Sequence, residues 1–152
     1  MEQVAQAQTQ GIFFHPLKQI SVQGGDVFHG LKKSDSGFVD FGEVYFSFIK
    51  AGNRKGWKKH NRMTLNLIVP VGEVNFFIHN EQLSRTLKIC VGQSNYGRLT
   101  IMPGLWVAFE GVGDDENLVT NIASIEHDPE EAEQRDQEAF SFDDYISWAD
   151  LL

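Results

Sequence analysis

Apolar and polar residues alternate along most of the chain, in short segments separated by turn-forming residues. Such segments cover residues 18–22, 26–31, 44–49, 64–69, 74–78, 86–91, 98–102, 105–110 and 118–125. A period of two indicates strands that bury one face. Short strands at this spacing, with almost no helical periodicity before residue 129, predict an all-β closed barrel or jelly roll and exclude a parallel βαβ sheet.

The C-terminal region has a different pattern. The segment Pro129–Gln137 predicts a short helix, because Asp128 can cap it and Pro129 suits its first position. Seven apolar residues then fall within the last thirteen: Phe140, Phe142, Tyr145, Ile146, Trp148, Leu151 and Leu152. We expect this tail to dock on the barrel or on a partner subunit. The predicted organisation is a flexible leader (1–11), a barrel (12–126) and an acidic helical and docking tail (127–152).

Length and charge narrow the function classes. A chain of 152 residues suits one domain with a real core. From Glu126 onward the chain has ten acidic residues and one basic residue, Arg135, which gives a local charge of −9. The total charge is −8, so residues 1–125 carry about +1. Without a basic face over the whole domain, nucleic acid is not expected as a partner. The single Cys90 excludes an intrachain disulfide, and we expect a cytoplasmic protein without signal peptide or membrane segment.

The positive charge is concentrated in one stretch. No acid occurs between Glu43 and Glu73, and six of the thirteen bases lie there: Lys50, Arg54, Lys55, Lys58, Lys59 and Arg62. Such a cluster predicts binding of a small anion, although a solvated surface loop is the competing interpretation.

Alternation suggests how a site could be built from this stretch. If residues 55–60 are extended, Lys58 and His60 share one face, with Lys55 and Lys59 on the other. In the following strand Thr64, Asn66 and Ile68 share a face and could oppose that pair across a barrel. The five histidines have no i, i+2 or i, i+4 spacing, so no compact metal motif is present. GxSxG motifs and phosphate-cradling glycine loops are also absent.

Three segments carry a family resemblance. The runs KGWKKH…MTLNLIVPVGEVNFFIHN, NYGRLTIMPGLWVAF and EHDPEEAE resemble the cupin proteins grouped with dTDP-4-dehydrorhamnose 3,5-epimerase, from about Phe14 to Glu133. The resemblance implies a double-stranded β-helix barrel that usually dimerises and binds thymidine-diphosphate-linked 4-keto-6-deoxy sugars. The family chemistry is proton removal beside a ketone, which needs a base, a stabiliser for the oxyanion and an acid. The Trp-Lys-x-His arrangement is similar to one subgroup of these proteins.

Several family positions are changed in this chain. The family's catalytic histidine corresponds to Lys58, with His60 two residues later, and its later lysine corresponds to Asn66. The family's tyrosine falls near Thr120 or Asn121. The cupin HxH pair is Lys58 and His60, and the histidine expected after PxGxx is Val107. No metal and no cofactor are therefore expected.

Our first hypothesis is an epimerase or ketoisomerase of a dTDP-4-keto-6-deoxyhexose, with His60 as base and Lys58 stabilising the enolate. The expected substrate-binding residues are Arg54, Lys55, Lys59, Arg62, Asn66, Tyr45 and Tyr96, the two tyrosines being candidate proton donors. The alternative is a binding or assembly cupin that has lost the reaction, and a third possibility is a metal-dependent cupin such as a dioxygenase. Convergence of Lys58, His60 and Asn66 in one pocket would support the enzyme; if they point into different environments, the enzyme interpretation fails.

Overall fold

The structure is a computed structural model and describes residues 9–151. Its strands are β1 (Ile12–Pro16), β2 (Gln19–Ile20), β3 (Val27–Phe28), β4 (Glu43–Lys50), β5 (Arg54–His60), β6 (Leu65–Val71), β7 (Glu73–Asn80), β8 (Arg85–Gly92), β9 (Gly97–Ile101), β10 (Trp106–Gly111), β11 (Glu116–Ala123), β12 (Ala132–Gln134) and β13 (Ile146–Ser147). Three 3-10 turns, η1 (Pro129–Glu131), η2 (Gln137–Ala139) and η3 (Trp148–Leu151), lie near the C-terminus. In this range no helix is long and apolar enough to cross a membrane.

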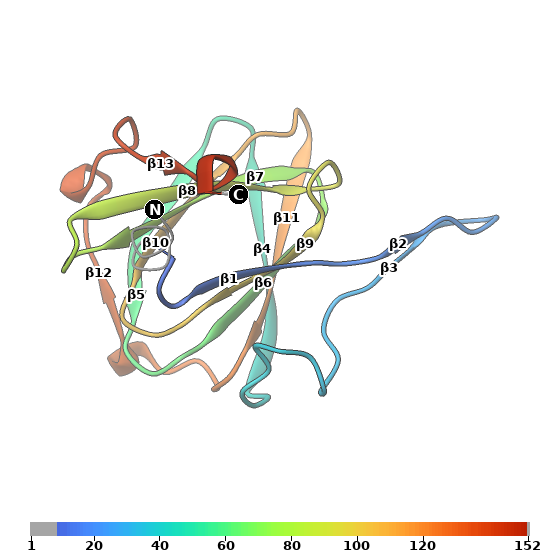
Figure 1. Cartoon of the computed structure of the whole chain (residues 1–152), viewed down its shortest axis with the longest axis horizontal. Helices are drawn as coiled ribbons and strands as arrows, with labels where there is room; N and C mark the ends of the chain where they lie inside the picture. The colour runs from blue at the N-terminus through green and yellow to red at the C-terminus, as the bar shows by residue number, and fades with distance from the viewer. Residues whose placement is uncertain (1–8, 152) are drawn as a thin grey trace.

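Two sheets face each other to form the barrel (Figure 1). One has the strand order β1-β9-β6-β11-β4 and the other β12-β5-β10-β7-β8-β13. Their paired strands are antiparallel except for β13, which runs parallel to β8. The hairpin β2-β3 projects away from this body (Figure 1). The predicted all-β, cupin-type jelly-roll barrel is confirmed.

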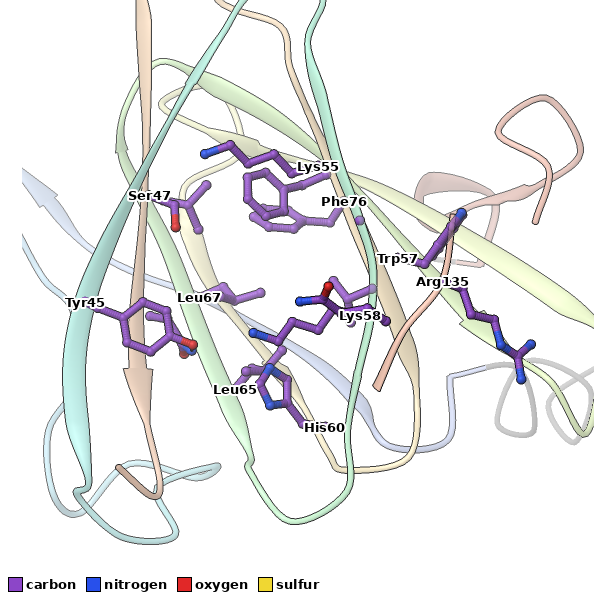
Figure 2. A pocket seen from close by; sticks show the side chains of 16 residues that line it. Tyr45, Ser47, Lys55, Trp57, Lys58, His60, Leu65, Leu67, Phe76 and Arg135 are labelled. Atoms are coloured by element: carbon purple, nitrogen blue, oxygen red, sulfur yellow. The ribbon is translucent and has the colours of Figure 1, made fainter. Parts of the chain in front are cut away.

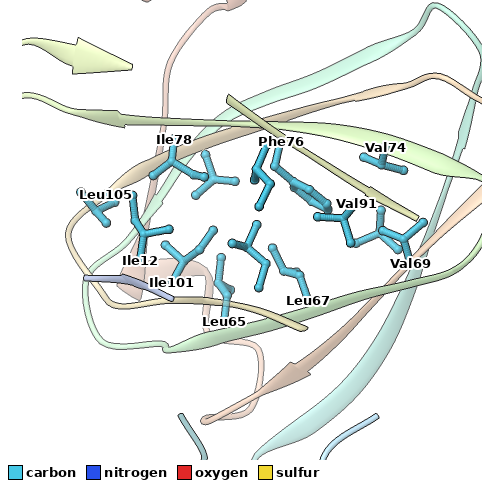
Figure 3. Packing of buried hydrophobic residues seen from close by; sticks show 14 of the residues in the cluster. Ile12, Leu65, Leu67, Val69, Val74, Phe76, Ile78, Val91, Ile101 and Leu105 are labelled. Atoms are coloured by element: carbon cyan, nitrogen blue, oxygen red, sulfur yellow. The ribbon is translucent and has the colours of Figure 1, made fainter. Parts of the chain in front are cut away.

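The main core lies between the two sheets, where alternate side chains of strands such as β6, β7 and β8 point inward (Figure 3). On β6 the inward residues are Leu65, Leu67 and Val69, and Phe76 on β7 meets them from the other sheet. Burying an apolar side chain of this size contributes roughly 1.5–3 kcal/mol. The core therefore fixes which face of β6 points inward, and polar residues of β6 take the outer face.

The structure refines the predicted segments. Each alternating segment from residue 44 to 125 contains a strand, with ends within a few residues of those predicted. Strand β1 was not predicted because IFFHP does not alternate. Residues 1–8 of the predicted leader lie outside the described residues, and residues 9–11 form a turn before β1.

The helix predicted over Pro129–Gln137 is wrong in its extent. Asp128 does accept a hydrogen bond from the Glu130 amide at 3.0 Å, and Pro129 opens the turn, but η1 ends at Glu131. The chain then becomes β12, which pairs with β5. Tertiary pairing with a free sheet edge has overridden the weak local preference for a helix.

The rest of the tail packs on the barrel of the same chain. Phe140 and Phe142 contact a second, smaller cluster that contains Trp57 and lies on the outer face of the β5 sheet. Farther along, Ile146 and Trp148 pack against the main core, and β13 extends the sheet beside β8.

A buried arginine joins a loop to the outer face of the other sheet. Arg98 on β9 is 1% exposed and donates hydrogen bonds to Asn66 Oδ1 at 3.0 Å, Gly30 O at 3.2 Å and Ser36 O at 2.6 Å. Its guanidinium also pairs with Asp35 at 3.3 Å. Because a buried cation needs partners for its donors, this network holds the 30–36 loop against the sheet.

We predict that Arg98→Met lowers the free energy of unfolding by about 3–5 kcal/mol, because it leaves Asp35 and the loop carbonyls without their donor. Urea denaturation measures this. The control is Arg62→Met, whose side chain is 61% exposed and pairs with Asp128, so its cost should be about 0–1 kcal/mol. Equal losses in the two variants would contradict the structural role of the Arg98 network.

Candidate active site

A pocket of about 370 Å³ lies between the two sheets, where β4 borders one sheet and β5 lies next to the border strand β12 of the other (Figure 2). Its lining residues come from both sheets and the tail: Tyr45, Ser47, Lys55, Gly56, Trp57, Lys58, His60, Leu65, Leu67, Phe76, Val107, Phe109, Val119, Asn121, Gln134 and Arg135. None of these is a carboxylate. The pocket therefore combines an apolar interior with cationic and neutral polar groups, which suits an anionic ligand.

A bulge in β5 brings two lysines to the same pocket. The register between β5 and β10 shifts between Val107 and Phe109, which pair with Lys58 and Lys55. Two residues of β5 thus oppose one of β10, and Gly56 stands at this point with a φ of +137°. A Cβ at Gly56 would lie 2.7 Å from a backbone atom of β10, so the close approach requires glycine. The expectation that Lys55 faces away from Lys58 was wrong because regular alternation does not cross a bulge.

His60 is held by a buried carboxylate from the tail. Its Nδ1–H donates to Glu131 Oε1, and the other oxygen of Glu131 accepts the backbone amides of Arg62 at 3.0 Å and Met63 at 3.2 Å. His60 and Glu131 are 7% and 4% exposed. With Nδ1–H bonded to Glu131, the tautomer that acts as a general base carries its lone pair on Nε2.

The hydrogen bonds also control the charge of Glu131. Burial raises the pKa of this carboxyl, but the bonds from His60 and from the amides of Arg62 and Met63 outweigh burial and leave the pKa below its ordinary value. Glu131 is therefore an anion at neutral pH. A fixed anion next to His60 stabilises the imidazolium that forms when the base takes a proton.

Tyr45 stands on the opposite wall from His60 (Figure 2). Its hydroxyl accepts a hydrogen bond from Asn121 Nδ2 at 2.8 Å and lies 3.8 Å from the Met63 sulfur. Burial raises the pKa of Tyr45, and the nearby Glu43 and Glu131 charges add to this against the Asn121 bond. The phenol is therefore protonated at neutral pH and can donate a proton.

Two of the six clustered cations line the pocket. The side chain of Lys58 has no hydrogen-bond or ion-pair partner among residues 9–151, and Figure 2 shows it reaching between His60 and Tyr45. Lys55 Nζ donates to the Phe48 carbonyl at 2.8 Å and has no carboxylate partner within the same residues. Both ammonium groups thus keep an uncompensated charge.

The other expected diphosphate ligands do not line the pocket. Each is paired with an acid: Arg54 with Glu110 at 2.7 Å, Lys59 with Glu133 at 3.1 Å, and Arg62 with Asp128 at 2.9 Å. Lys59 also lies over the Trp106 ring on the outer side of the sheet. These corrections follow from long-range pairing with β10 and the tail, which the spacing of the cations does not reveal.

Asn66 and Tyr96 are also placed elsewhere. The face pairing expected on β6 is present, but its leucines point into the pocket and Asn66 points outward to Arg98 and Thr100. Tyr96 donates to the His29 carbonyl at 2.6 Å, outside the lining. Lys58 and His60 thus share one pocket, whereas Asn66 occupies a different environment. Lys58 and His60 therefore meet the convergence criterion, whereas Asn66 fails it, and the separate position of Asn66 counts against the enzyme interpretation.

Sequence reasoning missed Glu131, Asn121 and Gln134. Glu131 is one of three glutamates in the segment PEEAE, and nothing in that segment distinguishes the buried one. Asn121 lies where the family tyrosine was expected, and in the structure it bonds to the tyrosine of the neighbouring strand β4. That contact follows from the β11-β4 register, which the sequence does not give. No group of three or more metal-ligating side chains occurs within residues 9–151.

We predict that Glu131→Ala lowers the free energy of unfolding by about 3–5 kcal/mol at pH 7, because three buried donors lose their acceptor. Thermal or urea denaturation measures this. Glu133→Ala is the matched control, and loss of its exposed pair with Lys59 should change the stability far less than Glu131→Ala does.

The difference in unfolding free energy between the parent and Glu131→Ala should depend on pH in a defined direction. Because the pKa of Glu131 is lowered in the folded state, its stabilisation is complete above the ordinary pKa of 4.5 and disappears as pH falls through the folded value. The stability difference between parent and Glu131→Ala should therefore narrow below about pH 4.5. A difference that is constant with pH would contradict the ionised pairing.

Comparison with known proteins gives the family. No family model matches the sequence, and no curated protein matches it. Among solved structures, a dTDP sugar isomerase from Desulfovibrio desulfuricans is 34% identical, with a TM-score of 0.82 over 86% of this chain and 87% of that one. Two more distant structures share the fold alone. A sugar 3,4-ketoisomerase from Thermoanaerobacterium thermosaccharolyticum, in complex with TDP, is 18% identical (TM-score 0.71; 85% and 90% of the two chains).

The second of these more distant structures is a dTDP-4-dehydrorhamnose 3,5-epimerase from Sulfolobus tokodaii, which is 15% identical (TM-score 0.77; 93% and 88% of the two chains). The identity to the dTDP sugar isomerase extends over nearly the full length of both chains and is too high for a likeness of fold alone. The chain therefore belongs to the family of this dTDP sugar isomerase, whose cupin-type fold it shares.

Proposed function

We propose that the protein is an epimerase or ketoisomerase that acts on a dTDP-4-keto-6-deoxyhexose by removing a proton from a carbon beside the ketone. The observation that carries this proposal is the buried His60–Glu131 pair, which presents a free imidazole nitrogen to a pocket with two uncompensated lysines. A base, an oxyanion stabiliser and an acid are what enolisation and reprotonation need.

His60 acts as the base. Nε2 takes the proton from the carbon, and the C–H electron pair forms the carbon–carbon double bond of the enolate while the ketone oxygen becomes an oxyanion. Glu131 stabilises the resulting imidazolium. The Lys58 ammonium, which lies beside His60 in the pocket, stabilises the oxyanion. The apolar floor lowers the local dielectric and strengthens this charge interaction.

Tyr45 returns the proton from the other side. It stands across the pocket from His60, and its raised pKa keeps the phenol protonated until a basic carbon or oxygen is presented. Reprotonation of the same carbon on the opposite face gives an epimer. If instead the former ketone oxygen gains a proton, the hydroxyl on the attacked carbon loses its proton and the former ketone carbon is protonated, the ketone moves to the neighbouring carbon. Both outcomes are isomerisations without net oxidation, so no redox partner is needed.

Lys55 binds the diphosphate in this proposal. Its ammonium group lies at the β4 side of the pocket, where Phe48 O holds it in place. An ammonium group is a point charge that suits phosphate oxygens. The six-membered sugar ring then lies against the apolar floor with its ketone toward Lys58.

Proton NMR in deuterated water tests the reaction directly, with dTDP-4-keto-6-deoxyglucose as the ligand. We expect loss of the signal at sugar carbon 3, carbon 5 or both, and the position lost identifies the carbon attacked. Binding without exchange would refute the enzyme and leave a sugar-nucleotide receptor. Neither binding nor exchange would reduce the family relationship to the fold.

We predict that His60→Ala abolishes the exchange while leaving the affinity for the ligand within about tenfold, or about 1.4 kcal/mol, because the lysines that bind the anion remain. The NMR assay and calorimetric titration measure the two quantities. His127→Ala, which changes an exposed histidine outside the pocket, should exchange at the parental rate. Equal exchange in His60→Ala and the parent would remove His60 from the mechanism.

We also infer that the protein is a homodimer in which a second copy covers the outer face of β4. This strand borders its sheet, and its outward side chains Val44, Phe46 and Phe48 are 39%, 60% and 57% exposed. The isolated hairpin β2-β3 also exposes Val27, and an unsupported two-stranded hairpin is marginally stable in water. A second copy would cover both apolar surfaces.

Phe46→Glu is predicted to shift the protein to the monomer, because it places a charge in the centre of the proposed interface. Sedimentation equilibrium should give about twice the 17.2 kDa chain mass for the parent and about that mass for the variant. Leu83→Glu is the control, since Leu83 is 39% exposed in the turn between β7 and β8. A parent that is monomeric at micromolar concentration would contradict the dimer.

A further inference from the structure

The tail segment that follows η1 supplies one side of the pocket. Gln134 and Arg135 line it, and Glu131 reaches His60 from the start of the same segment. The strand between them, β12, has three residues and forms the border of its sheet, where it pairs only with β5. A border strand of this length has little stability of its own. Something beyond it must hold it in place.

The first support is a set of bonds to Trp57. The backbone N–H of Trp57 donates to Arg135 O at 3.1 Å, and the Arg135 N–H donates back to Trp57 O at 3.0 Å. The indole N–H of Trp57 donates to Gln137 O at 3.2 Å. The side chains of Trp57 and Arg135 point away from the pocket (Figure 2), so this contact lies on the outer side of the wall.

The second support is an aromatic clamp on that outer side. Phe140 stacks on His79 with ring centres 3.8 Å apart and meets Trp57 edge-on at 5.3 Å. Phe142 stacks on Trp57 at 5.0 Å. The Arg135 guanidinium lies 5.6 Å from the Phe140 ring centre. Aromatic pairs of this kind contribute beyond their buried area, and here they meet at the tryptophan that bonds to the end of β12.

Both supports lead back to the base. Trp57 and His60 belong to β5, and β12 pairs with that strand at His60 itself. The Asn61 amide also donates to Glu131 O at 2.8 Å. A tail that is loose at Phe140 would release the end of β12, and Glu131 would no longer be fixed against His60.

We propose that Phe140 is a positioning residue for catalysis: stacked on His79 and edge-on to Trp57, it holds β12 and thereby keeps Glu131 on His60 and Gln134 at the pocket. The proposal rests on the proposed function for its catalytic part only. Its structural part, that the clamp at Phe140 controls the order of the pocket wall, is independent of any substrate. Phe140 contacts the side chains of Trp57 and Arg135 on the outer side of the wall and acts on the pocket through them.

The test compares four variants with the parent. Phe140→Ala removes the ring, and Phe140→Leu is a second variant that keeps apolar volume if the alanine variant does not fold. Phe140→Tyr keeps the ring and should rescue the parental behaviour. Tyr145→Ala is the matched control, because Tyr145 lies on the same tail but packs on Phe77 and Lys88 rather than on Trp57.

Amide hydrogen exchange gives the first readout. In Phe140→Ala and Phe140→Leu, hydrogen exchange at the Asn61 and Arg135 amides should be at least about tenfold faster than in the parent. Both amides form hydrogen bonds between the β5 region and the tail. In Phe140→Tyr and Tyr145→Ala it should stay within about threefold. Parental exchange in Phe140→Ala and Phe140→Leu, or equal acceleration in Tyr145→Ala, would overturn the proposal.

The rate of solvent-proton exchange at the sugar gives the second readout. Misplacing a catalytic pair costs on the order of tenfold to a hundredfold in kcat, whereas the lysines that bind the anion are untouched, so KM should stay within about threefold. Parental kcat in Phe140→Ala, despite faster amide exchange, would refute the positioning role. An inactive parent would refute the proposed function instead, and the amide exchange would still decide whether the clamp holds the wall.

Discussion

Strand β4 borders one sheet, and in the other sheet β5 is followed only by the three-residue border strand β12; the two sheets do not join along this seam, and the open seam governs the rest of the site. A sheet border presents unpaired N–H and C=O groups that favour pairing with another strand. The tail satisfies this demand at β5, where β12 adds a short strand opposite His60. Because β12 pairs with β5 instead of continuing as a helix, Glu131, which directly precedes β12, lies beside His60. The seam itself stays open as the pocket, with the apolar core as its floor.

The acidic tail and the cationic stretch are parts of one charge arrangement. Arg54, Lys59 and Arg62 pair with acids of β10 and the tail, which removes them as free charges. Lys55 and Lys58 point into the pocket, where no carboxylate lines the wall. The fold thus converts a broad cluster into a site with two uncompensated cations. Glu131 adds the one anion that the chemistry needs, placed behind the imidazole and away from the ligand.

The sequence predicted the barrel because alternation repeats over nine segments and is independent of distant contacts. It also indicated Lys58 and His60, since both lie on one short extended strand. The prediction from sequence failed where a long-range contact determines which way a side chain points. Asn66 faces outward because the leucines on either side of it are buried in the core, and the bulge at Gly56 turns Lys55 inward. Glu131 was unrecognisable because its role comes from pairing across seventy residues.

The account depends on the open seam being the place where the ligand binds, and a crystal structure of the protein with thymidine diphosphate tests this most directly. The account requires density for the diphosphate beside Lys55, with free space for a sugar between Lys58, His60 and Tyr45 and with the His60–Glu131 bond intact. Nucleotide bound on another surface, or a diphosphate coordinated by Arg54, Lys59 or Arg62 outside the pocket, would contradict it.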